Sequence, residues 1–255
     1  METLLQARDL SYSAGGKLIL RGASFKAKRG EFIALLGVNG AGKSTLLDIL
    51  AGLRAPTSGD VLLKGKPLAD VQACERARWV CHLPQGVRGE LPFTVEQIVL
   101  MGRYPHADRW MESEQDRAAV TAALERTHCL EFRHRRFSTL SGGERQRVLL
   151  AACLAQNAEI LLMDEPSTYL DLRHQMHCFE LLRSEASCGT VCIAVTHDLN
   201  LALTYCSRIL VLQGGIVRHD MPVEEAWRHK SWFLEFSERL QVEHSWNGKA
   251  WIAYR

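Results

Sequence analysis

The fold is decided by the stretch Gly37-Val38-Asn39-Gly40-Ala41-Gly42-Lys43-Ser44-Thr45, which fits the phosphate-binding pattern G-x-x-x-x-G-K-[ST] at every fixed position. Residues 31–36 before it read as a short buried strand, and residues 46–50 continue it as an apolar helix. A strand, a glycine-rich turn and a helix start gather backbone N–H groups and the positive helix end around a phosphate. The stretch therefore predicts a nucleoside triphosphate site, and an ordinary glycine-rich turn is the weaker interpretation.

Two side chains in this stretch have predicted chemical roles. Lys43 is expected to neutralise the β- and γ-phosphates, and the Ser44 hydroxyl is expected to ligate Mg²⁺. The other predicted nucleotide contacts are Gly37, Asn39, Gly40, Ala41, Gly42 and Thr45.

Residues 160–165 read Ile-Leu-Leu-Met-Asp-Glu, a buried parallel strand that ends in two carboxylates. The end of such a strand lies beside the phosphate turn, where Asp164 can hold Mg²⁺ through its water shell. Glu165 suits a general base that orients the attacking water. Alone, this pair is as often a solvated strand end; downstream of a phosphate loop it favours catalysis.

Residues 140–147, Leu-Ser-Gly-Gly-Glu-Arg-Gln-Arg, begin a helix. Ser141 is an N-cap, and Glu144 three residues later completes a capping box before an apolar helix face. Gly142 and Gly143 cost about 1 kcal/mol each relative to alanine at early helix positions, so capping leaves them unexplained. Bare backbone at a positive helix end does let a phosphate approach closely.

Residues 140–144 resemble the signature motif of ATP-binding cassette (ABC) proteins, usually written LSGGQ. The resemblance extends over residues 3–220, with the other motifs in family order. Two departures are mild. Glu144 replaces the usual Gln, which keeps the capping role but adds negative charge near an incoming γ-phosphate. Val38 occupies a variable loop position that is often proline.

Four further positions match motifs of the ABC family. Tyr12 stands where the family places an aromatic that stacks on adenine, and Gln85 follows a strand-like segment as the Q-loop glutamine. Residues 167–171, ending in Asp171, resemble the D-loop, and His197 ends a strand-like segment as the switch histidine. Taken singly, Tyr12 is more often a packing aromatic and His197 a hydrogen-bonded surface residue.

The resemblance implies an α/β P-loop NTPase with a RecA-like, mostly parallel sheet, an N-terminal antiparallel β subdomain and an inserted α-helical subdomain. It implies an ATPase that uses ATP and Mg²⁺. The catalytic residues it implies are Glu165, His197 and Gln85, and the Mg²⁺ ligands are Ser44, Gln85 and Asp164. The further nucleotide contacts that it implies are Tyr12, Ser141, Gly142, Gly143, Glu144 and Asp171.

The order of segments predicts three parts: an ATP-binding core with its β subdomain (1–85 and 159–221), an α-helical signature subdomain (86–158) and a C-terminal extension (222–255). Apolar strands alternate with helical patterns in the core, which favours a mostly parallel sheet covered on both faces. Residues 14–17 signal a hairpin, and helical periodicity covers 94–103 and 112–127.

The C-terminal extension differs in character from the core. Residues 222–240 are rich in Trp and charge and are expected to be helical. Asn247-Gly248 between two alternating runs is a strong hairpin signal, and Trp246 and Trp251 are candidate cross-strand neighbours. A stabilising cap is favoured over a ligand site.

Composition limits the class of protein. The chain has 255 residues, 47% hydrophobic and 24% charged, with a net charge of +2, which gives no reason to expect nucleic-acid binding. No bilayer-spanning run or export signal is evident. The eight cysteines contain no C-x-x-C pair and are read as reduced thiols, although His128/Cys129 and His174/Cys178 are conceivable metal ligands. The basic run 133–136 fits a solvated loop better than an anionic lipid contact.

One phosphate loop and one signature cannot complete an ABC site, because the family sandwiches ATP between two subunits. The resemblance therefore implies a homodimer bound to integral membrane permease subunits, peripheral on the cytoplasmic side of the inner membrane. A periplasmic or extracellular substrate-binding protein is implied through the complex. A soluble ABC ATPase, a cassette without turnover and a transporter for another substrate are the alternatives.

Residues 93–106 resemble importers of iron chelates, haem and cobalamin, where Gly-Arg-x-Pro-His recurs after this helix, and residues 197–202 resemble the same branch. Structurally, residues 102–105 can also simply end a helix. The expected cargo is a ferric siderophore, haem or a corrinoid. Residues 86–106 are expected to form the docking surface for the permease, and Arg103→Glu is expected to uncouple transport while leaving the fold and ATP binding intact.

Overall fold

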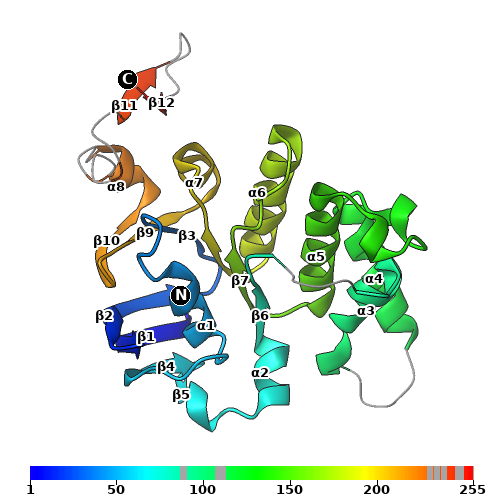
Figure 1. Cartoon of the computed structure of the whole chain (residues 1–255), viewed down its shortest axis with the longest axis horizontal. Helices are drawn as coiled ribbons and strands as arrows, with labels where there is room; N and C mark the ends of the chain where they lie inside the picture. The colour runs from blue at the N-terminus through cyan, green and yellow to red at the C-terminus, as the bar shows by residue number, and fades with distance from the viewer. Residues whose placement is uncertain are drawn as a thin grey trace.

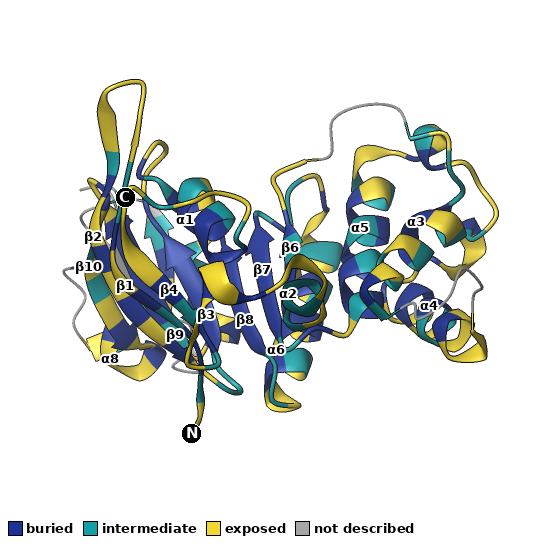
Figure 2. Ribbon diagram, turned by 90° about the horizontal axis from the view of Figure 1, so that it is seen from below, coloured by how far each residue is buried: buried dark blue, intermediate teal, exposed yellow. Residues whose placement is uncertain are grey.

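The computed structural model describes residues 1–86, 91–106, 113–228, 232, 236, 240–244 and 250–254. The sheets lie toward one end of the molecule, and a lobe of helices extends from the other end (Figure 1; Figure 2).

The central sheet has the strand order β10-β9-β3-β8-β7-β6, parallel from β9 to β6 and antiparallel at β10. Its strands are β3 (Phe32–Leu36), β6 (Val80–Leu83), β7 (Ile160–Asp164), β8 (Val191–Val195), β9 (Arg208–Gln213) and β10 (Ile216–Pro222). Strands β3, β7 and β8 are buried along their whole length, as parallel strands covered on both faces require. The predicted parallel sheet is confirmed. Helix α2 (Ala73–Trp79) leads directly into β6.

A second, antiparallel sheet packs beside the phosphate-loop helix. Its order is β2-β1-β4-β5, and its strands are β1 (Thr3–Ala14), β2 (Lys17–Lys28), β4 (Ser58–Leu63) and β5 (Lys66–Pro67). Ala14 pairs with Lys17, which confirms the predicted hairpin.

Alternate residues of β3 enter two different cores. Phe32, Ala34 and Leu36 belong to the core shared with the helical lobe and with α6 (Leu172–Ser187). Ile33 and Leu35 belong to the core shared with α1 (Lys43–Leu50) and the antiparallel sheet. The central sheet is therefore the wall between the two layers (Figure 2).

The helical lobe is built on α5 (Gly142–Gln156), against which α3 (Val95–Met101) and α4 (Glu114–Arg126) pack. Each of the three helices begins with a capping box, as the Ser141 motif predicted for α5. Short 3₁₀ turns lie at η2 (Tyr104–His106), η3 (Leu130–Phe132) and η4 (Phe137–Thr139).

The remaining helices are α1 (Lys43–Leu50), α6 (Leu172–Ser187), α7 (Leu199–Tyr205), α8 (Val223–Arg228) and the 3₁₀ turn η1 (Leu68–Asp70). The helix expected over 222–240 is confirmed in part: α8 covers Val223–Arg228, but Pro222 ends β10 and Leu240 begins β11. The predicted C-terminal hairpin is confirmed by β11 (Leu240–His244) and β12 (Ala250–Tyr254), which pair antiparallel. Glu243 stands opposite Trp251, while the Asn247-Gly248 turn and Trp246 lie outside the described residues.

Candidate functional site

The backbone requires glycine at two positions of the phosphate loop, one because another strand passes close to it and one because of its φ angle. A Cβ added at Gly37 would lie 2.3 Å from the carbonyl oxygen of Leu212 in β9. Gly42, the N-cap of α1, has a φ of +100°, which L-residues rarely adopt. The chain can therefore turn tightly from a buried strand into a helix, the geometry that collects backbone N–H groups around a phosphate.

Lys43 is a buried cation at the first position of α1. Its Nζ donates to the carbonyl oxygens of Gly37 at 2.7 Å and Val38 at 3.1 Å. Burial lowers the pKa of Lys43, and the charges of Glu165 and Asp164 oppose that shift. An ammonium carries three N–H donors, so these two carbonyls leave one for an anionic ligand.

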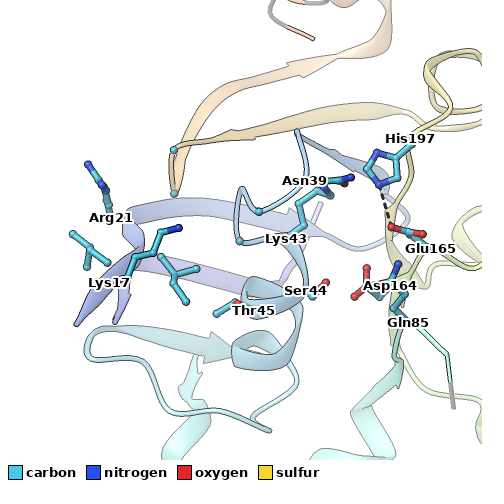
Figure 3. A pocket seen from close by; sticks show the side chains of 16 residues that line it. Lys17, Arg21, Asn39, Lys43, Ser44, Thr45, Gln85, Asp164, Glu165 and His197 are labelled. Atoms are coloured by element: carbon cyan, nitrogen blue, oxygen red, sulfur yellow. Dashed lines mark hydrogen bonds and ion pairs between the residues drawn. The ribbon is translucent and has the colours of Figure 1, made fainter. Parts of the chain in front are cut away.

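Asp164 ends β7 and is 3% exposed. Burial raises the pKa of its carboxyl group, and a hydrogen bond with Ser44 together with the charges of His82 and Lys43 opposes this shift. Figure 3 places Ser44 and Gln85 beside Asp164. The carboxylate, hydroxyl and amide oxygens of this group are donors that fit Mg²⁺.

Glu165 follows β7 in a left-handed backbone conformation, with a φ of +53°. Its Oε1 lies 3.0 Å from His197 Nε2, and its Oε2 accepts a hydrogen bond of 3.0 Å from the Thr168 hydroxyl. A left-handed residue with a side chain costs of order 1 kcal/mol, and such strain collects at functional sites. The turn aims the carboxylate at the histidine (Figure 3).

These groups line one cavity of about 960 Å³ (Figure 3). It brings together most of the predicted phosphate-loop and catalytic residues: Asn39, Gly40, Gly42, Lys43, Ser44, Thr45, Gln85, Asp164, Glu165 and His197. Gly37 and Ala41 complete the loop without lining the cavity.

The rest of the cavity wall was not predicted from the sequence. It consists of Lys17, Leu18, Ile19, Arg21, Gly214 and Gly215. Arg21 N donates to Gly215 O at 2.8 Å, and a Cβ on Gly215 would lie 2.3 Å from Ile19 O. The paired glycines at the β9–β10 turn were the available signal, because they permit this close crossing of β2.

Tyr12 is not among the residues that line this cavity. Its hydroxyl accepts a hydrogen bond of 2.7 Å from Arg54, whose guanidinium carbon lies 5.1 Å from the ring centroid. Stacking of Tyr12 on adenine stays a prediction.

The signature motif lines a separate, shallower hollow of about 470 Å³. Ser141 and Glu144 form the capping box there: Ser141 N donates to Glu144 Oε2 at 2.7 Å, and Glu144 N donates to Ser141 Oγ at 3.3 Å. The backbone hydrogen bond from Ser141 lowers the pKa of Glu144. The hollow unites the five predicted signature and D-loop residues, and adds four that were not among the predicted contacts: Arg147, Tyr169, Leu170 and His174.

The second glycine of the signature is required by the loop that follows β7. A Cβ added at Gly143 would lie 2.9 Å from the carbonyl oxygen of Tyr169, whereas one at Gly142 would lie 3.5 Å from the nearest atom. Gln146 Nε2 also donates to Pro166 O at 3.0 Å. The helix start is therefore packed directly on the loop that runs from Glu165 toward the D-loop.

Asp171 at the end of that loop is the N-cap of α6. Its Oδ1 accepts from His174 N at 2.9 Å and lies 2.8 Å from His174 Nδ1. The backbone hydrogen bond from His174 lowers the pKa of Asp171.

The expectation that Arg103→Glu would leave the fold intact is wrong, because Arg103 is paired inside the helical lobe. Its Nε donates to Asp116 Oδ1 at 2.9 Å and its Nη1 to Ala155 O at 2.8 Å, and only 14% of the side chain is exposed. His106 Nε2 lies 2.7 Å from Gln156 O, so both residues bind the last carbonyls of α5. This motif therefore holds the helical lobe together. Tyr104 between them is 84% exposed.

The structure also describes the cysteines, the candidate metal ligands, the length of the helices and the basic run 133–136. All eight cysteines are free thiols. Among the described residues, no group of three or more His, Cys, Asp or Glu could hold a metal, and no helix has the length and apolarity to cross a bilayer. In the basic run, Arg133 pairs with Glu96 and Arg135 with Glu144.

A family model described as ABC transporter matches residues 20–168, more than half of the chain, and spans the phosphate loop, the signature and Glu165. The chain belongs to the ABC transporter family. The cassette is thereby an ATP-hydrolysing subunit, as its motifs predicted.

Curated relatives cover most of the cassette. The hemin import ATP-binding protein HmuV of Streptomyces coelicolor is 43% identical over 89% of this chain and 80% of its own length. The petrobactin import ATP-binding protein FpuD of Bacillus anthracis is 41% identical over 84% of this chain and 79% of its own. The cobalamin import ATP-binding protein BtuD of Halobacterium salinarum is 41% identical over 85% of this chain and 54% of its own.

Solved structures share the fold. An ABC transporter assigned to the metal-chelate type, in an inward-facing conformation, matches with a TM-score of 0.82 and 25% identity over 100% of this chain and 97% of that chain. A dimeric ATP-binding cassette with bound ADP and phosphate, in a post-hydrolysis state, matches with a TM-score of 0.76 and 26% identity over 86% and 99%. The predicted P-loop NTPase fold with its β and α-helical subdomains is confirmed.

Proposed function

We propose that the cassette powers the import of a metal chelate, namely haem, a ferric siderophore or a corrinoid, through a membrane permease. The observation that carries this proposal is the similarity, at 41–43% identity, to ATP-binding subunits named for hemin, petrobactin and cobalamin import. These three cargoes share one chemistry, a metal ion enclosed by an organic ligand. The inward-facing transporter of metal-chelate type with the same fold supports the same class.

The proposed chemistry follows from the cavity. Lys43, already held by two loop carbonyls, directs its remaining donor at the γ-phosphate. Ser44 and Asp164, with Gln85 beside them, supply the oxygens for Mg²⁺, which when bound neutralises phosphate charge.

Glu165 is the proposed general base for the attacking water. Its Oε2 is held by Thr168, and its Oε1 lies 3.0 Å from His197 Nε2, so the carboxylate has a defined orientation. The proton of the water moves to this carboxylate as the water oxygen attacks the γ-phosphorus. The bond from that phosphorus to the β,γ-bridging oxygen breaks, and ADP and phosphate are the products.

We also propose that two copies of the cassette share each nucleotide. The signature hollow supports this, because the amides of a helix start at Ser141 open on the surface, separate from the phosphate-loop cavity of the same chain. In the proposed dimer, this hollow contacts the ATP that is bound in the phosphate-loop cavity of the second copy. A cassette that is 26% identical forms a dimer with bound ADP and phosphate, which supports a dimer here.

Mixed dimers test the sharing of sites. A Ser141→Arg chain blocks the helix start, and a Lys43→Ala chain lacks the phosphate clamp, so one site of the mixed dimer keeps both intact motifs. We expect the mixed dimer to close on ATP better than either mutant homodimer in crosslinking. Equal closure of all three would contradict sharing.

The division of labour is proposed as well. Residues 1–85 and 159–221 bind ATP, 86–158 carry the signature, and 222–255 form an extension. The permease is expected to dock along residues 86–106, which follow Gln85 in the cavity and include the 84% exposed Tyr104; residues 87–90 of this segment lie outside the described residues. The cassette is then peripheral on the cytoplasmic face of the inner membrane, and it works with a substrate-binding protein through the complex.

Uptake by a strain that lacks this gene tests the cargo. Labelled haem, ferric siderophore and cobalamin are offered in turn, and the gene is then restored. We expect loss of one of the three and its recovery on complementation. A Tyr104→Glu cassette is expected to keep ATP binding but not restore uptake, with Arg103→Lys as the control that preserves the Asp116 pair. Normal uptake of all three, with no second ATPase present, would remove the cargo proposal and leave the ATPase intact.

A further inference from the structure

A side chain of α7 pairs with the backbone of the C-terminal hairpin. Asn200 Nδ2 donates to Ile252 O at 3.0 Å, and Ile252 N donates to Asn200 Oδ1 at 2.8 Å. An asparagine amide has the same donor and acceptor as a peptide group, so Asn200 pairs with β12 as a neighbouring strand would. Ile252 itself is 7% exposed and belongs to the main core.

The position of Asn200 links the hairpin to the nucleotide site. Asn200 is the second residue of α7 and follows His197 by three residues. The turn between them is short and bonded: Asp198 N donates to Thr196 Oγ1 at 3.1 Å, and Asp198 Oδ1 accepts from Leu201 N at 3.0 Å. A displacement of the start of α7 therefore moves His197.

His197 is held loosely by the residues that the structure describes. Nearly half of its side chain, 48%, is exposed, and among those residues its ring nitrogen Nε2 approaches Glu165 Oε1 at 3.0 Å. Helix α7 has seven residues, too few to be stable without its neighbours. Its orientation is thus set by what packs on it, which includes α6, α8 and β12.

The same extension reaches the phosphate loop by a second route. The Trp232 ring is buried and donates from Nε1 to Ala226 O at 2.9 Å, and it meets the Phe236 ring edge-on at 6.0 Å. Phe236 shares the lining of a small cavity with Gly37 and Val38, whose carbonyl oxygens accept hydrogen bonds from Lys43 Nζ. The C-terminal extension thus lies near the phosphate loop and is bonded to the helix after the switch histidine.

We propose that Asn200 is a positioning residue for ATP hydrolysis: by pairing with Ile252 it makes the C-terminal hairpin hold α7, and with it His197, in register with Glu165. Detachment of the hairpin slows hydrolysis without weakening ATP binding, because the phosphate loop, Asp164 and the cavity wall stay in place. The extension is a control point, since whatever displaces the hairpin lowers turnover. This inference depends on the ATPase activity and on the proposed role of His197, and not on the cargo.

The test compares substitutions in the full-length cassette assembled in its transporter. Asn200→Ala removes both hydrogen bonds. Ile252→Pro removes the N–H that Asn200 accepts, at an edge where proline is tolerated. Ile252→Ala keeps that N–H and removes only the apolar contact, and Thr204→Ala changes an exposed residue one turn along α7.

We expect Asn200→Ala and Ile252→Pro each to lower kcat roughly three- to tenfold with KM for ATP unchanged, because a small misplacement of a catalytic group costs rate. Thr204→Ala should behave as wild type, and Ile252→Ala should keep at least half of the wild-type kcat. The double variant Asn200→Ala/Ile252→Pro should show no further loss, since both changes break one contact.

Two outcomes overturn the inference: wild-type kcat in Asn200→Ala, or additive losses in the double variant. A His197→Ala cassette separates this failure from that of the proposed chemistry. If His197→Ala keeps normal turnover, the proposed catalytic role of His197 is wrong. If His197→Ala is inactive while Asn200→Ala is normal, only the positioning role is wrong.

Discussion

Two buried aspartates, one in each lobe, have opposite electrostatic situations. Asp164 in the ATP-binding core is 3% exposed, and burial raises the pKa of its carboxyl group despite the hydrogen bond with Ser44. Asp116 in the helical lobe is 7% exposed, yet hydrogen bonds from Ser113 and Arg103 lower its pKa to about 2. The two side chains have similar exposed fractions, but they differ in how strongly burial desolvates the carboxyl group and in the hydrogen bonds that compensate it.

The difference distinguishes a ligand site from a structural contact. At Asp116 the protein supplies every partner that the carboxylate needs, so the charge stabilises the fold. At Asp164 it supplies too few, so the ionised carboxylate costs free energy until a cation arrives. Asp164 follows a buried strand near the phosphate loop and Asp116 belongs to the capping box of α4, so the surroundings of each carboxylate separate the two roles.

The largest effect on ATP hydrolysis is expected from substitution of Glu165, the residue after Asp164. Glu165→Gln should lower ATP hydrolysis by roughly 1,000-fold, because the amide cannot accept the proton of the attacking water. ATP binding should survive, since Lys43 and Ser44 are unchanged. Turnover by the assembled transporter and nucleotide binding by the purified cassette are the two measurements. Wild-type turnover would show that another group is the base.

Asp164→Asn should lower turnover by at least about 100-fold, because one oxygen donor for the cation is weakened. The same change should leave the melting temperature of the nucleotide-free cassette unchanged or raise it, since it removes an under-compensated buried charge. Calorimetry without nucleotide checks this. A clear fall in the melting temperature of Asp164→Asn would contradict the proposed difference between Asp164 and Asp116.

Asp116→Asn should behave in the opposite way, destabilising the cassette by about 2 kcal/mol at pH 7, which follows from a pKa lowered to about 2. Because the folded-state pKa lies below the unfolded value, this stability is present above about pH 4 and is lost as the pH falls toward 2. Urea unfolding at pH 7 and pH 3 measures it. Glu114→Gln, an exposed change on the same helix, is the control, and an equal loss there would refute the assignment.

Gly143→Ala should have the smallest effect, a loss of turnover of roughly three- to tenfold, because the added Cβ would lie 2.9 Å from Tyr169 O and push the D-loop away. Gly142→Ala, with 3.5 Å of room, is the matched control for lost helix-start flexibility. Steady-state rates for both variants decide the point. Equal rates would mean that close packing on the loop is unimportant.

Local chemistry explains why much of the molecule could be predicted from the sequence. The phosphate loop, the capping box at Ser141 and the two hairpins depend on residues a few positions apart, and their backbone demands are visible as Gly, Ser and Glu at fixed spacing. Full burial of β3, β7 and β8 likewise appears as unbroken apolar runs.

The errors and omissions arose where segments far apart in the chain meet. Arg103 looked like a surface cation, and only the fold brings Asp116 and the end of α5 to it. The β2 wall of the cavity depends on the turn at Gly214-Gly215 crossing over it, nearly two hundred residues away in the chain. Such long-range contacts are not visible in the periodicity or motif spacing of the sequence.

The sequence by itself determined that this chain binds and hydrolyses ATP, because that chemistry is encoded in contiguous motifs whose residues act through their own backbone and neighbours. Only the tertiary structure decided which buried charges are left for a ligand and which are paired, as at Asp164 and Asp116. It also decided that the C-terminal hairpin bonds to Asn200. The physical reason is that desolvation and pairing depend on what packs around a group, which is set by the whole fold.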